Sequence, residues 1–255
     1  MENDEYAIMY QIEQTHWWFV GKQFLIKSIL RRLYAKGTKE RNILDIGCGT
    51  GIILKLLSGF GTAYGMELSP EAIQFLGRRD LKLVVRSDAN APIAFRNNSF
   101  SAITCLDVLE HVDNDFFLIK ELVRVCKPGG HIIITVPAFN VLWSVHDDAL
   151  HHRRRYTRNR LLEKVDQLNC KVIKSSYYNT ALILPILVVR KLKRLFSKKQ
   201  VVRSDFFMRI PRWLNALLTF LFTSEICCLQ FLSFPFGVSF LLILQKWKGN
   251  TDASR

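Results

Sequence analysis

The stretch that decides the fold is "LDIGCGTG", residues 44–51. An apolar run precedes it and a helical pattern follows it, so we interpret it as the turn between a buried strand and a helix. Glycines alternate at positions 47, 49 and 51. A dinucleotide-binding turn would need a further glycine at position 52, where this chain has Ile52. Alternate glycines let the backbone bend tightly and approach a ligand that has no pyrophosphate.

Short apolar strands and helical segments alternate along the chain around this turn. Ser69 and Pro70 are the residue types that begin a helix, at the N-cap and at the first helical position. The pattern predicts helices at residues 50–60, 69–79, 114–126 and 158–169, and strands at residues 41–47, 63–68, 82–89, 100–109, 129–137, 170–179 and 236–246. Such alternation predicts an α/β fold with a mostly parallel sheet and helices on both faces.

The charge of the chain is divided unevenly. Residues 1–150 carry 16 Lys and Arg against 17 Asp and Glu, whereas residues 151–255 carry 20 against 5. The basic residues of the second part lie between strongly apolar stretches, which favours an anionic membrane surface over duplex nucleic acid as a partner. Residues 226–244 approach the length of a membrane span, but polar residues, a proline and a glycine interrupt them. A helical cap with an apolar face is therefore favoured over a span.

Cysteine usage and the amino-terminal residues indicate the compartment. The six cysteines show no Cys-x-x-Cys spacing, and most lie in apolar runs, as is typical of reduced core thiols. The acidic start of the chain lacks an apolar secretion segment. The sequence predicts a cytoplasmic protein, peripheral to the inner face of the membrane through its basic and apolar part.

Several separated segments resemble the class I S-adenosylmethionine-dependent methyltransferases, in the order in which that family has them. They include "DIGCGTG" at 45–51, "GMELS" at 65–69, the pair Asp88 and Ala89, "LDVLEHV" at 106–112 and "LVRVCKPGGHIIITVP" at 122–137. The segments 13–26, 146–157 and 234–246 resemble a bacterial subgroup often called type 11. The resemblance implies a Rossmann-like mixed sheet of seven strands with the last strand antiparallel, and S-adenosyl-L-methionine as the cofactor, with S-adenosyl-L-homocysteine as its product.

The same resemblance implies the cofactor contacts. The glycine-rich turn would hold the methionine part, Glu67 would accept hydrogen bonds from both ribose hydroxyls, and Asp88 would lie by the adenine. The full set implied is Asp45, Gly47, Cys48, Gly49, Gly51, Glu67, Leu68, Asp88, Ala89, Leu106, Asp107 and His111.

Methyl transfer to a hydroxyl also needs a proton acceptor, and a neutral histidine suits that task. His111 follows the fourth predicted strand, and further candidates follow the fifth: His146, Asp147, His151 and His152. Both places are carboxyl ends of parallel strands, where open α/β sheets build their sites. We expect His146 to act as the base with Asp147 as its orienter. His111 is either a second base or a packing residue beside the cofactor.

Five residues are candidates for substrate binding: Trp17, Trp18, His151, Arg154 and Tyr156. Trp17 and Trp18 either form an aromatic lid or anchor an amino-terminal helix to the core. Arg154 and Tyr156 either hold an anionic part of the substrate or stabilise their own loop. The histidines and aspartates of residues 146–152 are also metal-ligand types. Because metal centres draw ligands from several distant elements, with a carboxylate outside such a cluster, the sequence predicts no metal site.

The predicted organisation has four parts. Residues 1–40 are an amino-terminal helical cap, 41–179 the cofactor-binding core, 180–234 a basic and apolar helical insertion, and 235–255 the final strand and tail. The leading hypothesis is in-line methyl transfer to an oxygen of a small-molecule, sugar or lipid-linked acceptor. Methylation of RNA, DNA or protein and a non-catalytic cofactor-binding membrane scaffold are the alternatives. Nucleic acid is disfavoured because no Asn-Pro-Pro-Tyr-like string follows the fourth strand. The insertion contacts either the membrane, the substrate or a second copy in a homodimer.

Overall fold

Seven strands form one sheet in the order β3-β2-β1-β4-β5-β7-β6. The computed structural model describes residues 3–34, 41–188 and 210–248 of the chain. The strands are β1 (Asn42–Ile46), β2 (Thr62–Glu67), β3 (Val84–Arg86), β4 (Phe100–Leu106), β5 (Cys126–Pro137), β6 (Cys170–Tyr178) and β7 (Ser239–Lys246). The helices are α1 (Asn3–Ile12), α2 (Trp17–Tyr34), α3 (Ile52–Leu57), α4 (Pro70–Arg78), α5 (Asp115–Val125), α6 (Val145–Ala149), α7 (Arg158–Val165) and α9 (Arg212–Leu229). Short 3-10 turns occur at Asn140–Leu142 (η1) and Thr180–Leu182 (η2).

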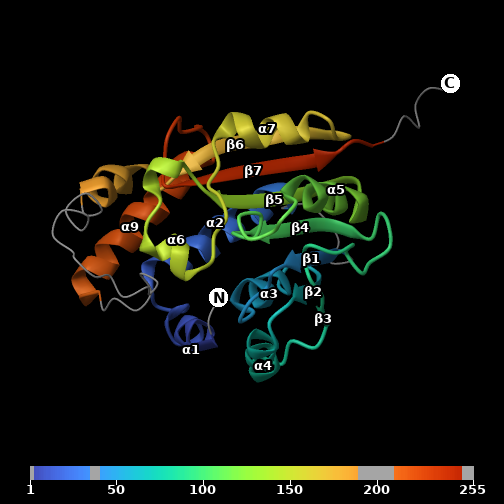
Figure 1. The fold of residues 1–255 in the computed structure, drawn as a ribbon, viewed down its shortest axis with the longest axis horizontal. Coiled ribbons are helices and arrows are strands. Elements are labelled where there is room, and N and C mark those ends of the chain that lie inside the picture. The colour runs from blue at the N-terminus through green and yellow to red at the C-terminus, as the bar shows by residue number, and fades with distance from the viewer. Residues whose placement is uncertain (1–2, 35–40, 189–209, 249–255) are drawn as a thin grey trace.

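The sheet is mixed in the way the sequence predicts. The pairs β1–β2, β1–β4, β2–β3 and β4–β5 are parallel, and β7 pairs antiparallel with both β5 and β6. Figure 1 shows the strands stacked in this order, with β6 at one edge and β3 at the other. The predicted Rossmann-like fold, with its antiparallel last strand, is confirmed.

Helices cover both faces of the sheet because side chains alternate along each strand. Ile132 and Ile134 of β5 point to the face on which α5 and α7 pack, whereas Ile133 between them points to the opposite face. That opposite face is covered by α2, α9 and part of α3. The strands are therefore apolar on both sides, as expected for the centre of an α/β sheet.

The predicted third and fifth strands differ from the structure in extent. β3 forms only over Val84–Arg86 of the predicted 82–89. β5 begins at Cys126, because the predicted turn at residues 127–130 lies within the strand. Phe100 pairs with Cys126 and Ala102 with His131, so the residues between them bulge out of register. Gly129, with φ at 77°, supplies the left-handed conformation that such a bulge favours.

The predicted helical insertion lies between β6 and β7. Its described part contains η2, a helical stretch at residues 183–188, and α9, and the basic connector at residues 189–209 lies outside the described residues. Within the described ranges, every helix falls short of the length and apolar character that a membrane crossing needs. The contact of this insertion with a second copy stays a prediction.

α9 packs directly on α2, and one glycine permits the close contact. A Cβ atom on Gly21 of α2 would lie 2.0 Å from Cδ1 of Phe222 of α9. Phe222 is buried, and its ring stacks on Tyr178 at 5.8 Å between centroids. Gly21 therefore fixes how closely the insertion approaches the amino-terminal cap.

We predict that Gly21→Ala lowers the free energy of unfolding by about 1–3 kcal/mol, the usual cost of overpacking a well-filled contact. The matched control is Gly77→Ala in α4, where a new Cβ would meet nothing within 4 Å. This control should be neutral or stabilising by up to about 1 kcal/mol, because alanine is the better helix former. Urea unfolding monitored by circular dichroism measures both. Equal stability of the two variants would contradict the packing argument.

Candidate active site

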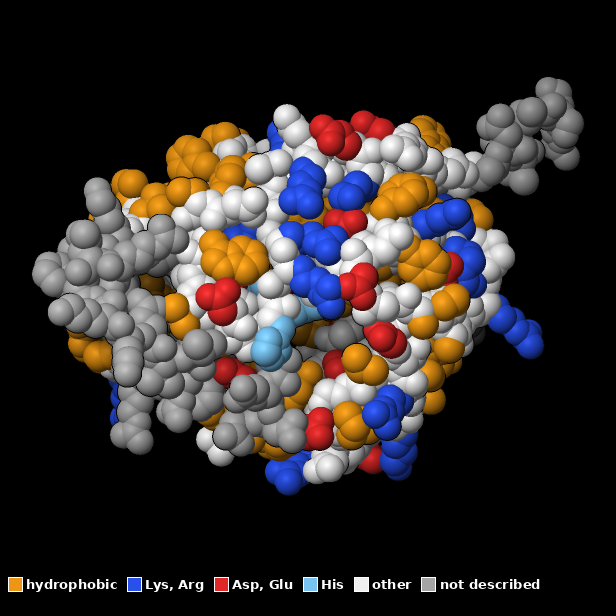
Figure 2. Space-filling view, in the orientation of Figure 1, with side chains coloured by type: hydrophobic (Ala, Val, Ile, Leu, Met, Phe, Trp, Pro, Cys, Tyr) orange, Lys and Arg blue, Asp and Glu red, His pale blue; other side chains and the backbone are white. Residues whose placement is uncertain are grey.

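A large cavity opens at the carboxyl ends of β1, β2 and β4. Its volume is about 1260 Å³, more than the roughly 300–1,000 Å³ of common small-molecule sites. The walls come from the glycine-rich turn, the strand ends, the amino-terminal helices, residues 143–155 and the insertion. Figure 2 shows a hollow near the middle of this face, with histidine at its rim and Lys and Arg side chains beside it.

The glycine-rich turn forms one end of the cavity. Gly47, Gly49 and Gly51 all have positive φ, at 66°, 53° and 88°. A Cβ on Gly47 would lie 2.6 Å from Val108 Cγ2, whereas a Cβ on Gly49 would point into open space. The turn therefore packs on the "LDVLEHV" segment at Gly47, and it leaves its backbone bare at Gly49, where a ligand can approach.

Glu67, at the end of β2, is held in place by backbone N–H groups. Its Oε2 accepts from the Gly49 N–H over 2.8 Å, and its Oε1 accepts from the N–H groups of Leu68 and Ser69, each over 2.9 Å. The residue is 7% exposed and lines the cavity. A carboxylate has about four acceptor positions, so Glu67 keeps capacity for at least one hydroxyl of a ligand.

Asp45, at the end of β1, lies beneath the turn. Its Oδ1 accepts from the Thr104 hydroxyl over 2.6 Å. Burial raises the pKa of Asp45 to about 7, and the hydrogen bond from Thr104 only partly opposes this. Asp45 thus holds a proton far more readily than a surface carboxyl does.

Two ion pairs, one buried and one partly buried, fasten the amino-terminal cap over the site. Glu13, which is completely buried, pairs with Arg79 and accepts from the Thr50 hydroxyl of the glycine-rich turn. Lys22 of α2 pairs with Asp107 at the end of β4. Burial lowers the pKa of Lys22, against the opposing charges of Glu110 and Asp45. The sequence analysis did not predict Glu13 or Lys22. The signal for Lys22 was its position on the apolar face of α2, four residues before Ile26.

Asp107 has an unusual backbone conformation that its neighbours maintain. Its φ is 54°, in the left-handed region that non-glycine residues seldom adopt. The Thr135 hydroxyl donates to Asp107 Oδ1 over 2.9 Å, and the Asp107 N–H donates to the Thr135 carbonyl over 2.9 Å. Strain of this kind concentrates at functional sites.

Asp147 is completely buried and organises the loop after β5. Its carboxylate accepts from Arg155 Nε over 2.7 Å and from Arg155 Nη2 over 3.0 Å. Its Oδ1 also lies 2.9 Å from His152 Nδ1. Burial would raise the pKa of Asp147, but the hydrogen bonds from His152 and Arg155 and the Arg155 charge hold it well below its usual value. The expectation that Asp147 orients His146 is therefore wrong, because its histidine partner is His152.

Glu110 and His111 complete this wall, beside His152. Glu110 is completely buried, and burial raises the pKa of its carboxyl. Burial is also the main reason that the pKa of His111 falls to about 3, with the neighbouring His152 acting in the same direction. His111 is thus a neutral imidazole at physiological pH. Sequence reasoning missed Glu110, although it immediately precedes His111 in the segment that carried the resemblance.

Comparison with known proteins agrees with this geometry. A family model described as a methyltransferase domain matches residues 44–134. A ubiquinone biosynthesis O-methyltransferase of Alkalilimnicola ehrlichii is 31% identical over 111 residues, which cover 39% of this chain and 42% of the relative. One of Cupriavidus pinatubonensis is 26% identical over 132 residues, 47% of this chain and 53% of the relative. The chain thus spans about half the length of the curated relatives it matches.

Solved structures share the fold over most of the chain. A putative methyltransferase of Haloferax volcanii, in complex with its activator, superposes with a TM-score of 0.61 at 14% identity, covering 96% of this chain and 95% of that one. A SAM-dependent methyltransferase of Archaeoglobus fulgidus gives 0.54 at 19% identity, covering 88% and 94%. Residues 44–134 therefore match a methyltransferase domain, and the chain has the fold of the class I S-adenosylmethionine-dependent methyltransferases.

The methyltransferase domain has a cavity that suits its cofactor, because it offers a bare glycine backbone at one end and the Glu67 carboxylate beside it. Of the twelve residues that the resemblance implied, all but Gly51 line this cavity. Gly51 instead packs under α4, where a Cβ would lie 2.4 Å from Leu76 Cδ2. Its contribution is the left-handed conformation that begins α3.

The predicted substrate and catalytic residues divide into two groups. Trp17, Trp18, His111 and His146 line the cavity. Both tryptophans also contact Phe222 of α9, at 6.1 and 6.0 Å between ring centroids. Each tryptophan therefore lines the cavity and also anchors the amino-terminal cap to the insertion.

Three of the predicted substrate residues, His151, Arg154 and Tyr156, lie outside the cavity wall. Tyr156 is completely buried, and its hydroxyl contacts Asp115 Oδ2 at 2.9 Å. Arg154 Nη1 lies 3.4 Å from the same Asp115 oxygen. The side chain of His151 is exposed to solvent. Arg154 and Tyr156 stabilise the loop and the start of α5 instead.

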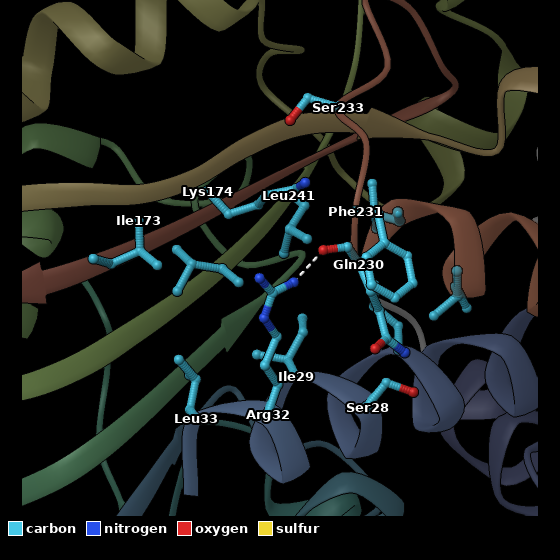
Figure 3. Close-up of a pocket in the computed structure, with 14 residues that line it drawn as sticks. Ser28, Ile29, Arg32, Leu33, Ile173, Lys174, Gln230, Phe231, Ser233 and Leu241 are labelled. Carbon is cyan, nitrogen blue, oxygen red and sulfur yellow. Dashed lines mark hydrogen bonds between the residues drawn. The ribbon is translucent and has the colours of Figure 1, made fainter.

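A second cavity, of about 310 Å³, lies between α2, β6, β7 and the end of α9. Arg32 donates to the Gln230 carbonyl, marked by the dashed line in Figure 3, and Lys174 Nζ donates to the Leu232 carbonyl over 2.6 Å. Cations at the last carbonyls of a helix are a common capping contact. This cavity therefore belongs to the attachment of α9.

We predict that Glu67→Ala weakens S-adenosylmethionine binding by about 10- to 100-fold, the usual effect of removing a charged hydrogen-bond acceptor. Isothermal titration calorimetry measures this. Glu163→Ala, which removes an exposed carboxylate from α7, should bind like the unaltered chain. Unchanged affinity in Glu67→Ala would contradict the assignment of the cofactor site.

Proposed function

We propose that the chain transfers the methyl group of S-adenosylmethionine to an oxygen of a small-molecule or lipid-linked acceptor with an apolar portion. The observation that carries this proposal is the lining of the cavity. The cavity is lined by the glycine-rich turn, by His111 and His152, and by apolar residues of the insertion. These apolar residues, called here the apolar wall, include Leu182, Pro185, Ile186, Leu214 and Leu218. The polar wall would receive the hydroxyl and the apolar wall the remainder of the acceptor.

The domain's own residues would act mainly by positioning. The bound cofactor supplies an electrophilic methyl group on its sulfonium. The acceptor oxygen must be held about 3 Å from the methyl carbon, in line with the carbon–sulfur bond that breaks. Glu67 and the backbone at Gly49 would fix the cofactor, and Lys22 with Trp18 would close the site from the cap. The Lys22 ammonium lies 5.4 Å from the Trp18 ring centroid, which keeps both side chains at the wall. Curated relatives named as O-methyltransferases support oxygen as the acceptor atom.

The chain is also proposed to work at an anionic membrane surface on the cytoplasmic side. The insertion presents large apolar side chains to solvent, with Trp213 at 69% exposed, Phe220 at 66% and Phe231 at 85%. In the sequence, residues 190–212 contain nine Lys and Arg against one acidic residue. Apolar side chains beside basic ones favour attachment to anionic lipid.

We predict that Leu218→Glu raises KM for a long-chain hydroxyl acceptor by about 10- to 100-fold, because a charge would face the acceptor's apolar part. Methyl transfer from radiolabelled cofactor to catechol and to a catechol with a long alkyl chain, both in solution, measures this. The short acceptor should be much less affected. Leu217→Glu, at the adjacent exposed position outside the cavity wall, is the matched control. No transfer to any hydroxyl acceptor, despite cofactor binding, would contradict the proposed function.

Membrane attachment is expected to need anionic lipid. The chain should co-sediment with phosphatidylglycerol vesicles at low salt, detach as salt rises, and remain free of phosphatidylcholine vesicles, because the basic residues act through screened charge. Replacing Trp213 and Phe220 by serine should lower the partition coefficient by about tenfold. Failure of the unaltered chain to bind anionic vesicles at low salt would contradict attachment.

A further inference from the structure

We infer that Glu110, His111 and His152 bind a divalent transition-metal cation at the polar wall of the cavity. Their ligand atoms, one carboxylate oxygen and one nitrogen from each ring, lie within 4.8 Å of one another. They come from two separate segments, one after β4 and one after α6. A cation at this place would activate the acceptor hydroxyl, and that role rests on the proposed function. The binding of a cation does not depend on the proposed function.

Glu110 needs a partner that the protein does not supply. Its carboxylate is completely buried, and neither oxygen accepts a hydrogen bond from another residue in the described part of the chain. The charges of Lys22 and Arg155 act on Glu110, but the ion pairs of these two residues are with Asp107 and Asp147. An unpartnered carboxylate in a buried site is costly. A bound cation facing the cavity would satisfy it.

His152 has the environment of a metal ligand. Its Nδ1 lies 2.9 Å from Asp147 Oδ1, and the same carboxylate accepts two hydrogen bonds from Arg155. With Nδ1 held at this carboxylate, Nε2 is the nitrogen left for a cation. A histidine whose second nitrogen donates to a buried carboxylate is the usual arrangement around protein-bound metals.

His111 supplies the third ligand atom. Its ring lies beside that of His152 in the wall of the cavity. The rings of His111 and His152 meet edge to face, with centroids 4.8 Å apart and planes at 76°. Each imidazole therefore offers one ring nitrogen within 4.8 Å of the other two ligand atoms.

The geometry suits a three-ligand site with an open position. Metal–nitrogen and metal–oxygen bonds of about 2.0–2.2 Å place ligand atoms about 3–4 Å apart, so cation binding would draw these side chains together by roughly 1 Å. Two imidazoles and one carboxylate favour Zn²⁺, Co²⁺ or Mn²⁺ over Mg²⁺ and Ca²⁺. Because all three residues line the cavity, the open position would face the acceptor.

A cation here would activate the acceptor oxygen. A hydroxyl bound to a divalent cation loses its proton more readily, and that proton would pass to water. The oxygen lone pair then forms the bond to the methyl carbon. The carbon–sulfur bond of the cofactor breaks, and its electron pair stays on sulfur. This route needs no protein side chain to hold the proton.

The test is a titration of chelator-treated, full-length protein with Co²⁺, followed by visible absorption and calorimetry. We expect one Co²⁺ per chain with nitrogen and oxygen ligands, and at least a tenfold loss of affinity in Glu110→Gln and in His152→Ala. His131→Ala is the matched control, because that imidazole pairs with Tyr34 outside the cavity. S-adenosylmethionine binding by each variant verifies that the site is still folded.

Several results would overturn the inference. One is the absence of saturable Co²⁺ binding. Another is unchanged Co²⁺ affinity in Glu110→Gln and His152→Ala when both still bind S-adenosylmethionine. A third is a thiolate absorption band, which would assign the cation to a cysteine such as Cys48. Methyl transfer that survives chelation unchanged would overturn the activating role. Tight Co²⁺ binding without transfer to any hydroxyl would contradict the proposed function and still support the cation site.

Discussion

The hydrogen bond from the Gly49 N–H to Glu67 Oε2 is the constraint on which the rest of the site depends. It joins the turn after β1 to the end of β2, two strands that are adjacent in the sheet. The N–H can point at the carboxylate because Gly47, Gly49 and Gly51 all adopt positive φ, which side chains at these positions would oppose. Once this bond sets the spacing between the two strand ends, the bare backbone and the carboxylate face the same cavity.

The cap over this site is held by two ion pairs, of which Glu13–Arg79 is buried. Glu13 contacts the glycine-rich turn and Lys22 contacts the end of β4. A buried ion pair adds little net stability over apolar packing, but breaking it leaves an uncompensated charge. Because each charge needs its own partner, the two contacts fix the positions of α1 and α2. The cap is therefore held against the turn after β1 and the end of β4, where cofactor-binding residues also lie.

The fold could be predicted from the sequence because it is encoded locally. Alternating strands and helices, with Ser69 and Pro70 at a helix start, are visible without any tertiary information. Glu67 and Asp88 were predicted from the resemblance to the methyltransferase family, and both line the cavity, at the end of β2 and just after β3. The bulge in β5 could not be predicted, because pairing with β4 and β7 overrides the turn preference of "KPGG". The position of Tyr156 could not be predicted either, because only tertiary packing shows that its hydroxyl faces Asp115 within the core.

The loop after β5 shows why the chemistry of a site is harder to predict than its location. His146 and Asp147 are adjacent on the short helix α6, and adjacent helical side chains diverge by about 100°. His151 has φ at 58°, which reverses the chain, and the His152 N–H donates to the Asp147 carbonyl over 2.9 Å. His152 is thereby returned to the aspartate that precedes it by five positions. The string at 146–157 does not by itself form a metal centre, because it lacks a distant carboxylate. The sheet supplies one when it brings Glu110, from the end of β4, against the same histidine.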